Sequence, residues 1–271
     1  LGINYEDDPL INGFYPLGLD FVVCQGRFLV VISNQDNLRV LELNHAQELN
    51  STQLEILSQW QALFTSESNK KLLHTHLWNS LNLESVNKKF YIDIIQNFAN
   101  LKQHLTNNNH FDNNQAVIFT NRLIGRLLFC YFLIKKDFIP TEYLELDQQN
   151  DNEYYHNKLS QLFFAVLNTP INDRNHADRT TPYLNGGLFE RKDTDIANVT
   201  FPDNYFSNLF AIFRKYNWTV DESLSNYEVM AIDPEMLGRI FENLLAEINV
   251  DNDGSSESAR KAKGAFYTPR V

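Results

Sequence analysis

The sequence has few cysteines and none of the short motifs that mark a metal centre. It contains two cysteines, Cys24 and Cys130, and both stand in apolar runs. We interpret them as buried free thiols, although a disulfide between them stays open; nothing in their number requires an oxidising compartment. No CxxC or HExxH pair occurs, and the spacing of His74 and His76 would place them on different faces of a helix. The sequence therefore predicts no metal site in this chain.

Catalytic motifs are also missing. A nuclease site that holds Mg²⁺ requires an Asp followed by an acid-x-Lys pair on a strand. After Asp20 the chain offers Gln25-Gly26-Arg27, which lacks the lysine. The triplet Asn185-Gly186-Gly187 has no following lysine, so it does not predict a phosphate-binding loop, and no nucleophile elbow occurs. We expect no catalytic constellation in residues 1–248, and Mg²⁺ only if a nuclease domain precedes this chain.

Positive charge is scarce, and the sequence has no long apolar run. The formal net charge is −11, so any contact with DNA must come from local basic patches. Hydrophobic residues make up 43% of the chain, with 20 Phe and 12 Tyr, which predicts a folded core rather than disorder. No apolar run has the length of a membrane span, and no signal sequence begins at Leu1. We expect a cytoplasmic location, no membrane contact, and a chain that is cut at both ends.

The first residues, 1–45, predict a short β region. The stretch LDFVVCQGRFLVVIS reads as two strands joined by a turn at Gln25-Gly26, and LRVLEL alternates as a third. A three-strand antiparallel meander buries little surface alone, so we expect it to pack on helices or to complete a sheet.

Residues 46–248 predict a multi-helix domain, which makes the fold class mainly α. Two apolar stripes have helical spacing: Leu54, Leu57, Trp60 and Leu63, with Ser51-Thr52 as a cap, and then Phe90, Ile94, Ile95 and Phe98. LSQLFFAVL, DNYFSNLFAIFRKY and DPEMLGRIFENLLAEI predict further helices, while Pro182 and Asn185-Gly186-Gly187 break regular structure.

The stretch AVIFTNRLIGRLLFCYFLIKK is apolar nearly all round and predicts the central core helix. Its only charged residues before the final lysines are Arg122 and Arg126, four apart on one face. They can pair with carboxylates or cap carbonyl groups, or they can contact DNA phosphates. Both interpretations stay open, and both arginines are our candidates for DNA contact.

The last residues predict a linker followed by the start of a new module. Residues 249–263 are almost without apolar side chains, which is typical of a flexible linker. In residues 264–271, GAFYTPRV, a glycine allows close backbone approach and Phe266 or Tyr267 could lie against a cationic ligand such as a sulfonium. Thr268 offers a hydroxyl group, and Pro269 fixes the turn.

Three motifs in order carry a resemblance: RLLFCYFLIKKDFIP, then PYLNGGLFE, then DPEMLGRIFENLL, followed by the charged linker and GAFYTPRV. Together they resemble the start of the methyltransferase domain of DNA adenine-N6 methyltransferases. More closely, they resemble large single-chain type II restriction–modification enzymes, in which nuclease, helical connector, methyltransferase and target recognition share one polypeptide. The resemblance spans roughly residues 121–271 and is weaker before them. It implies that residues 46–248 are the helical connector domain, that residues 264–271 start the methyltransferase domain, and that residues 1–45 could form the end of an N-terminal nuclease-like domain.

The resemblance implies that Phe266, Tyr267, Thr268 and Pro269 contact S-adenosylmethionine in the full-length protein. It also implies double-stranded DNA as the partner and a role in defence against phage. The glycine-rich cofactor strand and the Asn/Asp-Pro-Pro-Tyr/Phe motif of the family do not occur here. We therefore expect this piece to be a catalytically inert connector that holds no cofactor alone.

Two other interpretations stay open. The chain could be an acidic helical scaffold that docks a protein partner, or the connector of a phage-defence methyltransferase without a nuclease. An acid-x-Lys core upstream would favour the nuclease fusion. The sequence does not indicate the DNA target or the oligomeric state.

Overall fold

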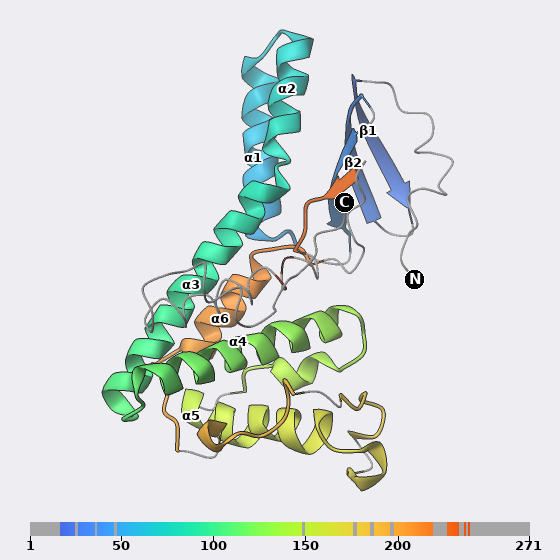
Figure 1. Ribbon diagram of the computed structural model, residues 1–271. Helices are drawn as coiled ribbons and strands as arrows, with labels where there is room; N and C mark the ends of the chain where they lie inside the picture. The colour runs from blue at the N-terminus through green and yellow to red at the C-terminus, as the bar shows by residue number, and fades with distance from the viewer. Residues whose placement is uncertain are drawn as a thin grey trace, which may run out of the picture. The chain divides into compact units, whose positions relative to one another are not determined.

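The computed structural model describes residues 17–24, 27–35, 37–45, 48–147, 150–175, 178–184, 187–195, 198–218, 227–232, 236 and 238. The chain forms two compact units, shown in Figure 1. Unit 1 holds Leu1–Tyr91 and Ile212–Met236, and unit 2 holds Ile92–Ala211 and Leu237–Val271. The prediction of a mainly α protein with a small N-terminal antiparallel meander is confirmed. The predicted domain boundaries, including those of the linker, stay predictions.

The sheet lies in unit 1 and has the order β1-β2-β3-β4 in the described part of the chain. Its strands are β1 (Leu17–Cys24), β2 (Arg27–Asn34), β3 (Asn37–Asn44) and β4 (Tyr227–Val229). β1 to β3 form the predicted antiparallel meander, whereas β4 pairs in parallel with β3 and was not predicted. The amide of Met230 extends this pairing by donating to the Val40 carbonyl at 3.0 Å.

Helices α1 (Ser51–Ser66) and α2 (Lys70–Ser80) also belong to unit 1 and bond to the sheet. Gln53 Nε2 donates to the Glu42 carbonyl at 2.8 Å. Arg39 Nη1 donates to the Trp78 carbonyl at 2.8 Å, and its guanidinium lies 4.3 Å from the centre of the Trp78 ring. The expectation that the meander packs on helices is therefore confirmed.

The predicted apolar stripe of α1 is confirmed at Trp60 and was wrong at Leu54. The helix buries Gln53, Ile56 and Trp60, while Leu54 is 54% exposed. Gln53 is buried because its amide bonds to β3, an interaction that a hydrophobic pattern does not reveal. The cap is Asn50, just before the predicted Ser51-Thr52, and it forms a capping box with Gln53.

Helix α3 (Leu83–Asn108) contains the boundary between the two units. Phe90, Ile94 and Phe98 are buried as predicted, and Ile95 is half-buried. In unit 1 the Phe90 ring packs edge-on against Tyr216 at 5.0 Å and Trp218 at 5.4 Å.

Helix α4 (Asn113–Lys135) is the core helix of unit 2, as predicted. It buries thirteen of its residues. By length and composition it could cross a membrane, contrary to the expectation that no segment has that length; 67% of its most apolar window is buried inside the protein, which suits a core helix. Cys130 is a free, buried thiol, and burial raises its pKa.

The N-terminus of α4 is closed by Asp112, and we expect Asp112→Ala to destabilise the protein by about 1 kcal/mol. The Asp112 carboxylate accepts a hydrogen bond from the backbone N–H of Gln115 at 2.7 Å, and the side-chain oxygen of Gln115 accepts one from the backbone N–H of Asp112 at 3.1 Å. Urea unfolding followed by circular dichroism measures the change. Asp112→Asn, which also caps well, should retain most of the stability; an equal loss would show that the cap hydrogen bond is not the cause.

The predicted LSQLFFAVL helix is present but has π-helical geometry. A short turn, α5 (Asp151–Glu153), leads into η4 (Tyr154–Leu159) and η5 (Gln161–Leu167), both π-helical. Helix α6 (Tyr205–Arg214) follows and packs Phe206 and Phe210 against Tyr154. Short 3₁₀ turns are η3 (Thr141–Leu144), η6 (Ile171–Asp173) and η8 (Asp193–Asp195). The predicted DPEMLGRIFENLLAEI helix lies almost wholly outside the described residues.

Candidate functional site

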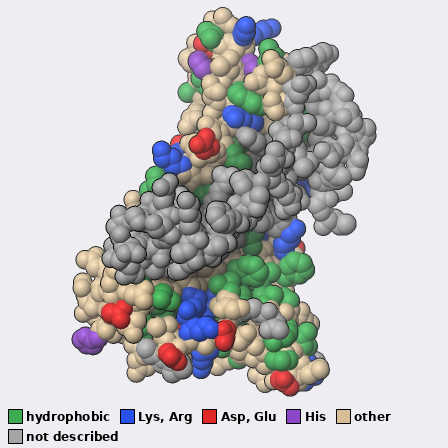
Figure 2. Space-filling model, in the orientation of Figure 1, with side chains coloured by type: hydrophobic (Ala, Val, Ile, Leu, Met, Phe, Trp, Pro, Cys, Tyr) green, Lys and Arg blue, Asp and Glu red, His purple; other side chains and the backbone are tan. Residues whose placement is uncertain are grey.

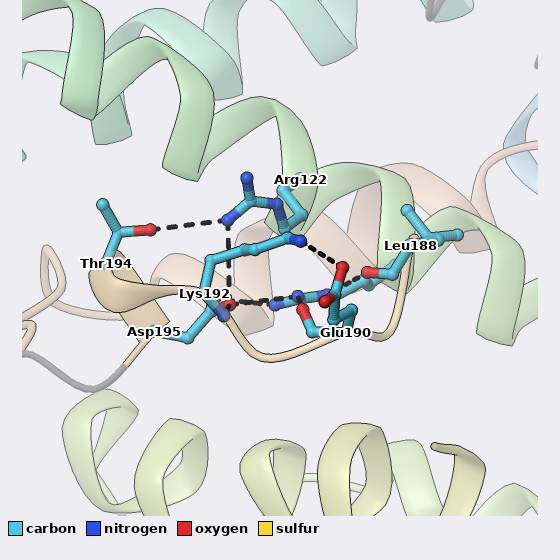
Figure 3. A network of polar contacts seen from close by, with 7 residues as sticks. Arg122, Leu188, Glu190, Lys192, Thr194 and Asp195 are labelled. Atoms are coloured by element: carbon cyan, nitrogen blue, oxygen red, sulfur yellow. Dashed lines mark hydrogen bonds and ion pairs between the residues drawn. The ribbon is translucent and has the colours of Figure 1, made fainter. Parts of the chain in front are cut away.

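Arg126 is the centre of a buried polar network between α4 and the 187–195 loop (Figure 3). Its Nη1 and Nη2 donate to the two carboxylate oxygens of Asp195 at 2.8 and 3.1 Å. Its Nε and Nη2 also donate to the carbonyls of Leu188 and Glu190 at 2.7 and 2.9 Å. The side chains of Arg126 and Asp195 are each 1% exposed. A buried guanidinium is tolerated here because a carboxylate neutralises it and two backbone carbonyls accept further hydrogen bonds from it.

Asp195 is held by more than one partner. Its Oδ2 accepts from the Lys192 amide at 2.9 Å and lies 3.7 Å from Arg122 Nη1. Arg122 also donates to the Thr194 hydroxyl at 3.4 Å, and its side chain is 19% exposed. Burial lowers the pKa of Arg122, and the charge of Asp195 acts in the opposite direction. The loop therefore folds around one carboxylate that faces two arginines.

Aromatic rings of η5 pack against the arginines of this network. The Arg126 guanidinium lies 5.0 Å from the Phe164 ring centre and 5.5 Å from that of Phe163. The guanidinium of Arg191 lies 4.5 Å from the same Phe164 ring. Phe189 packs at 5.8 Å from Phe163, so the loop is held by rings as well as by charge.

A second buried arginine, Arg174, folds the loop that precedes PYLNGGLFE. It is 5% exposed, and its guanidinium donates hydrogen bonds to four backbone carbonyls. Nε donates to Thr169 at 2.6 Å, Nη1 donates to Thr181 at 2.5 Å and Asp178 at 3.2 Å, and Nη2 donates to Pro182 at 3.2 Å. A single side chain thus closes a polar turn that has little apolar surface to bury.

These arrangements hold the chain together and supply no reactive group. Arg126 and Arg174 each make four hydrogen bonds through their guanidinium groups. Burial raises the pKa of the neighbouring Tyr155, which keeps its phenol protonated. Among the described residues, no three His, Cys, Asp or Glu side chains are grouped so that they could hold a metal ion. We infer that the network acts as a structural clamp.

The predicted site residues have different outcomes. The structure shows the carboxylate and carbonyl pairing that was one of the two interpretations of Arg122 and Arg126. DNA contact by these two arginines stays a prediction, and the burial of Arg126 leaves its guanidinium out of reach of a phosphate in this conformation. The cofactor candidates Phe266, Tyr267, Thr268 and Pro269 lie outside the described residues.

The sequence did not reveal Asp195, Arg174 or Arg191 as members of these networks. Asp195 and Arg191 stand in a charged loop that looks like ordinary solvated surface. A signal was present for Asp195, because two arginines in an apolar helix require a carboxylate somewhere in the chain.

Two comparisons with known proteins bear on this region. Residues 119–189 match the protein family described as "MmeI, helicase spacer domain". Over 165 residues the chain is 33% identical to a putative type II restriction enzyme and methyltransferase from Methanocaldococcus jannaschii. That match covers 56% of this chain but only 13% of the relative. No solved structure matches the chain.

These matches confirm the resemblance to single-chain restriction–modification enzymes and support a connector region. The matched spacer segment starts inside α4 and ends at Phe189. It therefore contains Arg126 and the carbonyl of Leu188 that Arg126 binds. The motifs RLLFCYFLIKKDFIP and PYLNGGLFE, which are separated in the sequence, meet at this hydrogen bond.

Proposed function

We propose that the chain is the helical connector of an enzyme that methylates adenine N6 in double-stranded DNA and cleaves DNA with an endonuclease in the same polypeptide. The match to the spacer family carries the proposal, because it covers the segment in which the two motifs contact each other. The name of the archaeal relative, which joins a restriction enzyme with a methyltransferase, supports the combination of activities.

The connector would set the distance and orientation of the modules on either side of it. The buried network supports this role, because an ion pair inside a packed core resists deformation more than a solvated loop does. The methyl transfer itself would be direct attack of adenine N6 on the sulfonium methyl of S-adenosylmethionine, after the base is flipped out of the duplex.

S-adenosylmethionine would bind with the help of Phe266, Tyr267, Thr268 and Pro269. These residues lie outside the described part, so their role is proposed from the motif GAFYTP alone. Mg²⁺ belongs to the proposal only through an endonuclease domain elsewhere in the polypeptide. A cytoplasmic enzyme of this type would act in defence against phage.

The test uses the full-length polypeptide that contains this chain. Unmethylated duplex DNA is incubated with methyl-labelled S-adenosylmethionine, digested to nucleosides and separated. We expect the label in N6-methyladenine, and site-specific cleavage of unmethylated DNA when Mg²⁺ is added. Label in cytosine, or no transfer at all, would overturn the methylation proposal. Methylation without cleavage would identify a methyltransferase that lacks a nuclease.

The connector role also makes a prediction for the isolated 271-residue chain. Calorimetric titration with S-adenosylmethionine should give no heat of binding at micromolar concentrations, because the glycine-rich cofactor strand of the family is absent. The full-length polypeptide serves as the positive control. Micromolar affinity in the isolated chain would show that it holds a complete cofactor pocket, and the connector proposal would then be wrong.

A further inference from the structure

We propose that Arg191 contacts the phosphate backbone of DNA, and that Arg126 is the buried positioning residue that holds the 187–195 loop in place for this contact. The inference rests on the proposed function, since it requires DNA as the partner. The buried Arg126 does not reach a phosphate in this conformation, whereas Arg191 in the neighbouring loop is exposed.

The charges around the loop leave Arg191 uncompensated. Asp195 is bound by Arg126, and Glu190 forms an ion pair with Lys192. The hydrogen bond and charge of Lys192 lower the pKa of Glu190, so this carboxylate stays ionised and matched with its lysine. Asp193 is exposed in the same loop, but Arg191 forms no ion pair with it or with any other residue in the described ranges.

The geometry holds the Arg191 guanidinium ready for an anion. The group lies 4.5 Å from the centre of the Phe164 ring, whose other guanidinium neighbour is Arg126 at 5.0 Å. A cation that lies over a ring face is held by its charge and not by hydrogen bonds, so its N–H donors stay available, and a planar fork of donors matches two phosphate oxygens. Because the contact with Phe164 restricts the Arg191 side chain before DNA binds, less conformational entropy is lost on binding than for a freely rotating lysine.

The surroundings favour a phosphate backbone. Arg122 on α4 and Lys192 in the same loop have side chains that are 19% and 40% exposed, and each already faces a carboxylate. With Arg126 and Arg191 they exceed the three carboxylates of the loop, Glu190, Asp193 and Asp195, by one positive charge. Figure 2 shows Lys and Arg side chains close together, with a few carboxylates beside them, on the lower part of the face that it draws. In a chain with a net charge of −11, such a local group is what DNA binding would require.

The experiment measures binding of the full-length polypeptide to a labelled duplex of mixed sequence by fluorescence anisotropy at several salt concentrations. For Arg191→Ala we expect affinity to fall on the order of fivefold at low salt, and the slope of log K against log salt to decrease by about one. Arg191→Lys should recover part of the affinity, because it restores the charge without the planar fork. The matched control is Arg179→Ala, which removes an exposed arginine from another loop of unit 2 and should change neither quantity.

The outcomes separate this inference from the proposed function. Equal losses in the Arg191 and Arg179 variants would show that net charge alone matters, and unchanged binding of Arg191→Ala would show that Arg191 does not contact DNA; either result overturns the inference. If the wild-type polypeptide binds DNA through Arg191 but methylates no adenine, the function proposal fails while the inference stands. If the wild-type polypeptide does not bind DNA, both fail.

Discussion

Arg126→Met is expected to lower the free energy of unfolding by about 3–5 kcal/mol, because it leaves the buried carboxylate of Asp195 without its main partner. Asp195 is 1% exposed at its side chain, so water cannot take over the role of the guanidinium. The carbonyls of Leu188 and Glu190 lose their donors as well. Urea unfolding followed by far-ultraviolet circular dichroism measures the loss, since unit 2 is mainly helical and its unfolding lowers the helical signal.

The matched control is the double variant Arg126→Met/Asp195→Leu. Removing both charges avoids the unpaired carboxylate, so we expect the double variant to be more stable than Arg126→Met alone. If the double variant is no more stable, the effect comes from lost packing rather than from an uncompensated charge. A loss below about 1 kcal/mol for Arg126→Met would contradict the clamp altogether.

Phe206→Ala is expected to have a similar effect of about 3–5 kcal/mol, by leaving a cavity in unit 2. The Phe206 side chain is fully buried. Its ring centre lies 4.9 Å from that of Phe201, 5.1 Å from Tyr154 and 5.2 Å from Tyr205, so one ring joins α6 to η4 and to the segment before α6. The same urea titration measures the change.

The control for this cavity is Phe138→Ala, since Phe138 also lies in unit 2 but is 56% exposed. Its truncation should cost far less. A comparable loss in both variants would show that aromatic content, and not burial, sets the stability.

The tryptophans add a second readout to both experiments. Trp60, Trp78 and Trp218 all belong to unit 1, whereas Arg126 and Phe206 belong to unit 2. Tryptophan fluorescence therefore follows unit 1, while circular dichroism follows the helices of both units. If the two signals shift together in a variant of unit 2, the units unfold as one; if only the dichroism shifts, a single free energy of unfolding does not describe the chain.

Local patterns allowed much of the fold to be predicted. The apolar runs on either side of the turn signal Gln25-Gly26 and the alternation of LRVLEL predicted the meander, and the long apolar run predicted α4 as the core helix. The apolar stripe of α1 was predicted correctly at Trp60, but Leu54 was chosen in place of Ile56. The two side chains offer competing apolar stripes, and only the tertiary hydrogen bond of Gln53 to β3 decides between them. The strand β4 was missed because its partner β3 lies near the other end of the chain, and no local signal reports such a pairing.

The site was predictable only in part. Arg122 and Arg126 stood out as charges in an apolar helix, and their pairing with a carboxylate was one of the two interpretations. Asp195 lies 69 residues after Arg126, in a loop rich in both signs of charge, where several acids compete for the role. The choice of Asp195 follows from how the loop closes over the rings of η5, which depends on the whole fold of unit 2.

The parallel strand β4 has a consequence for how the protein is made. Unit 1 is discontinuous: residues 1–91 leave the ribosome first, but residues 212–236, which carry β4, follow only after the whole first part of unit 2. Translation proceeds at roughly 5–20 residues per second, so β4 is synthesised on the order of ten seconds after the three strands of the meander. During this delay the β3 edge exposes unpaired backbone groups to other nascent chains, so expression at low temperature or with a chaperone should increase the soluble yield.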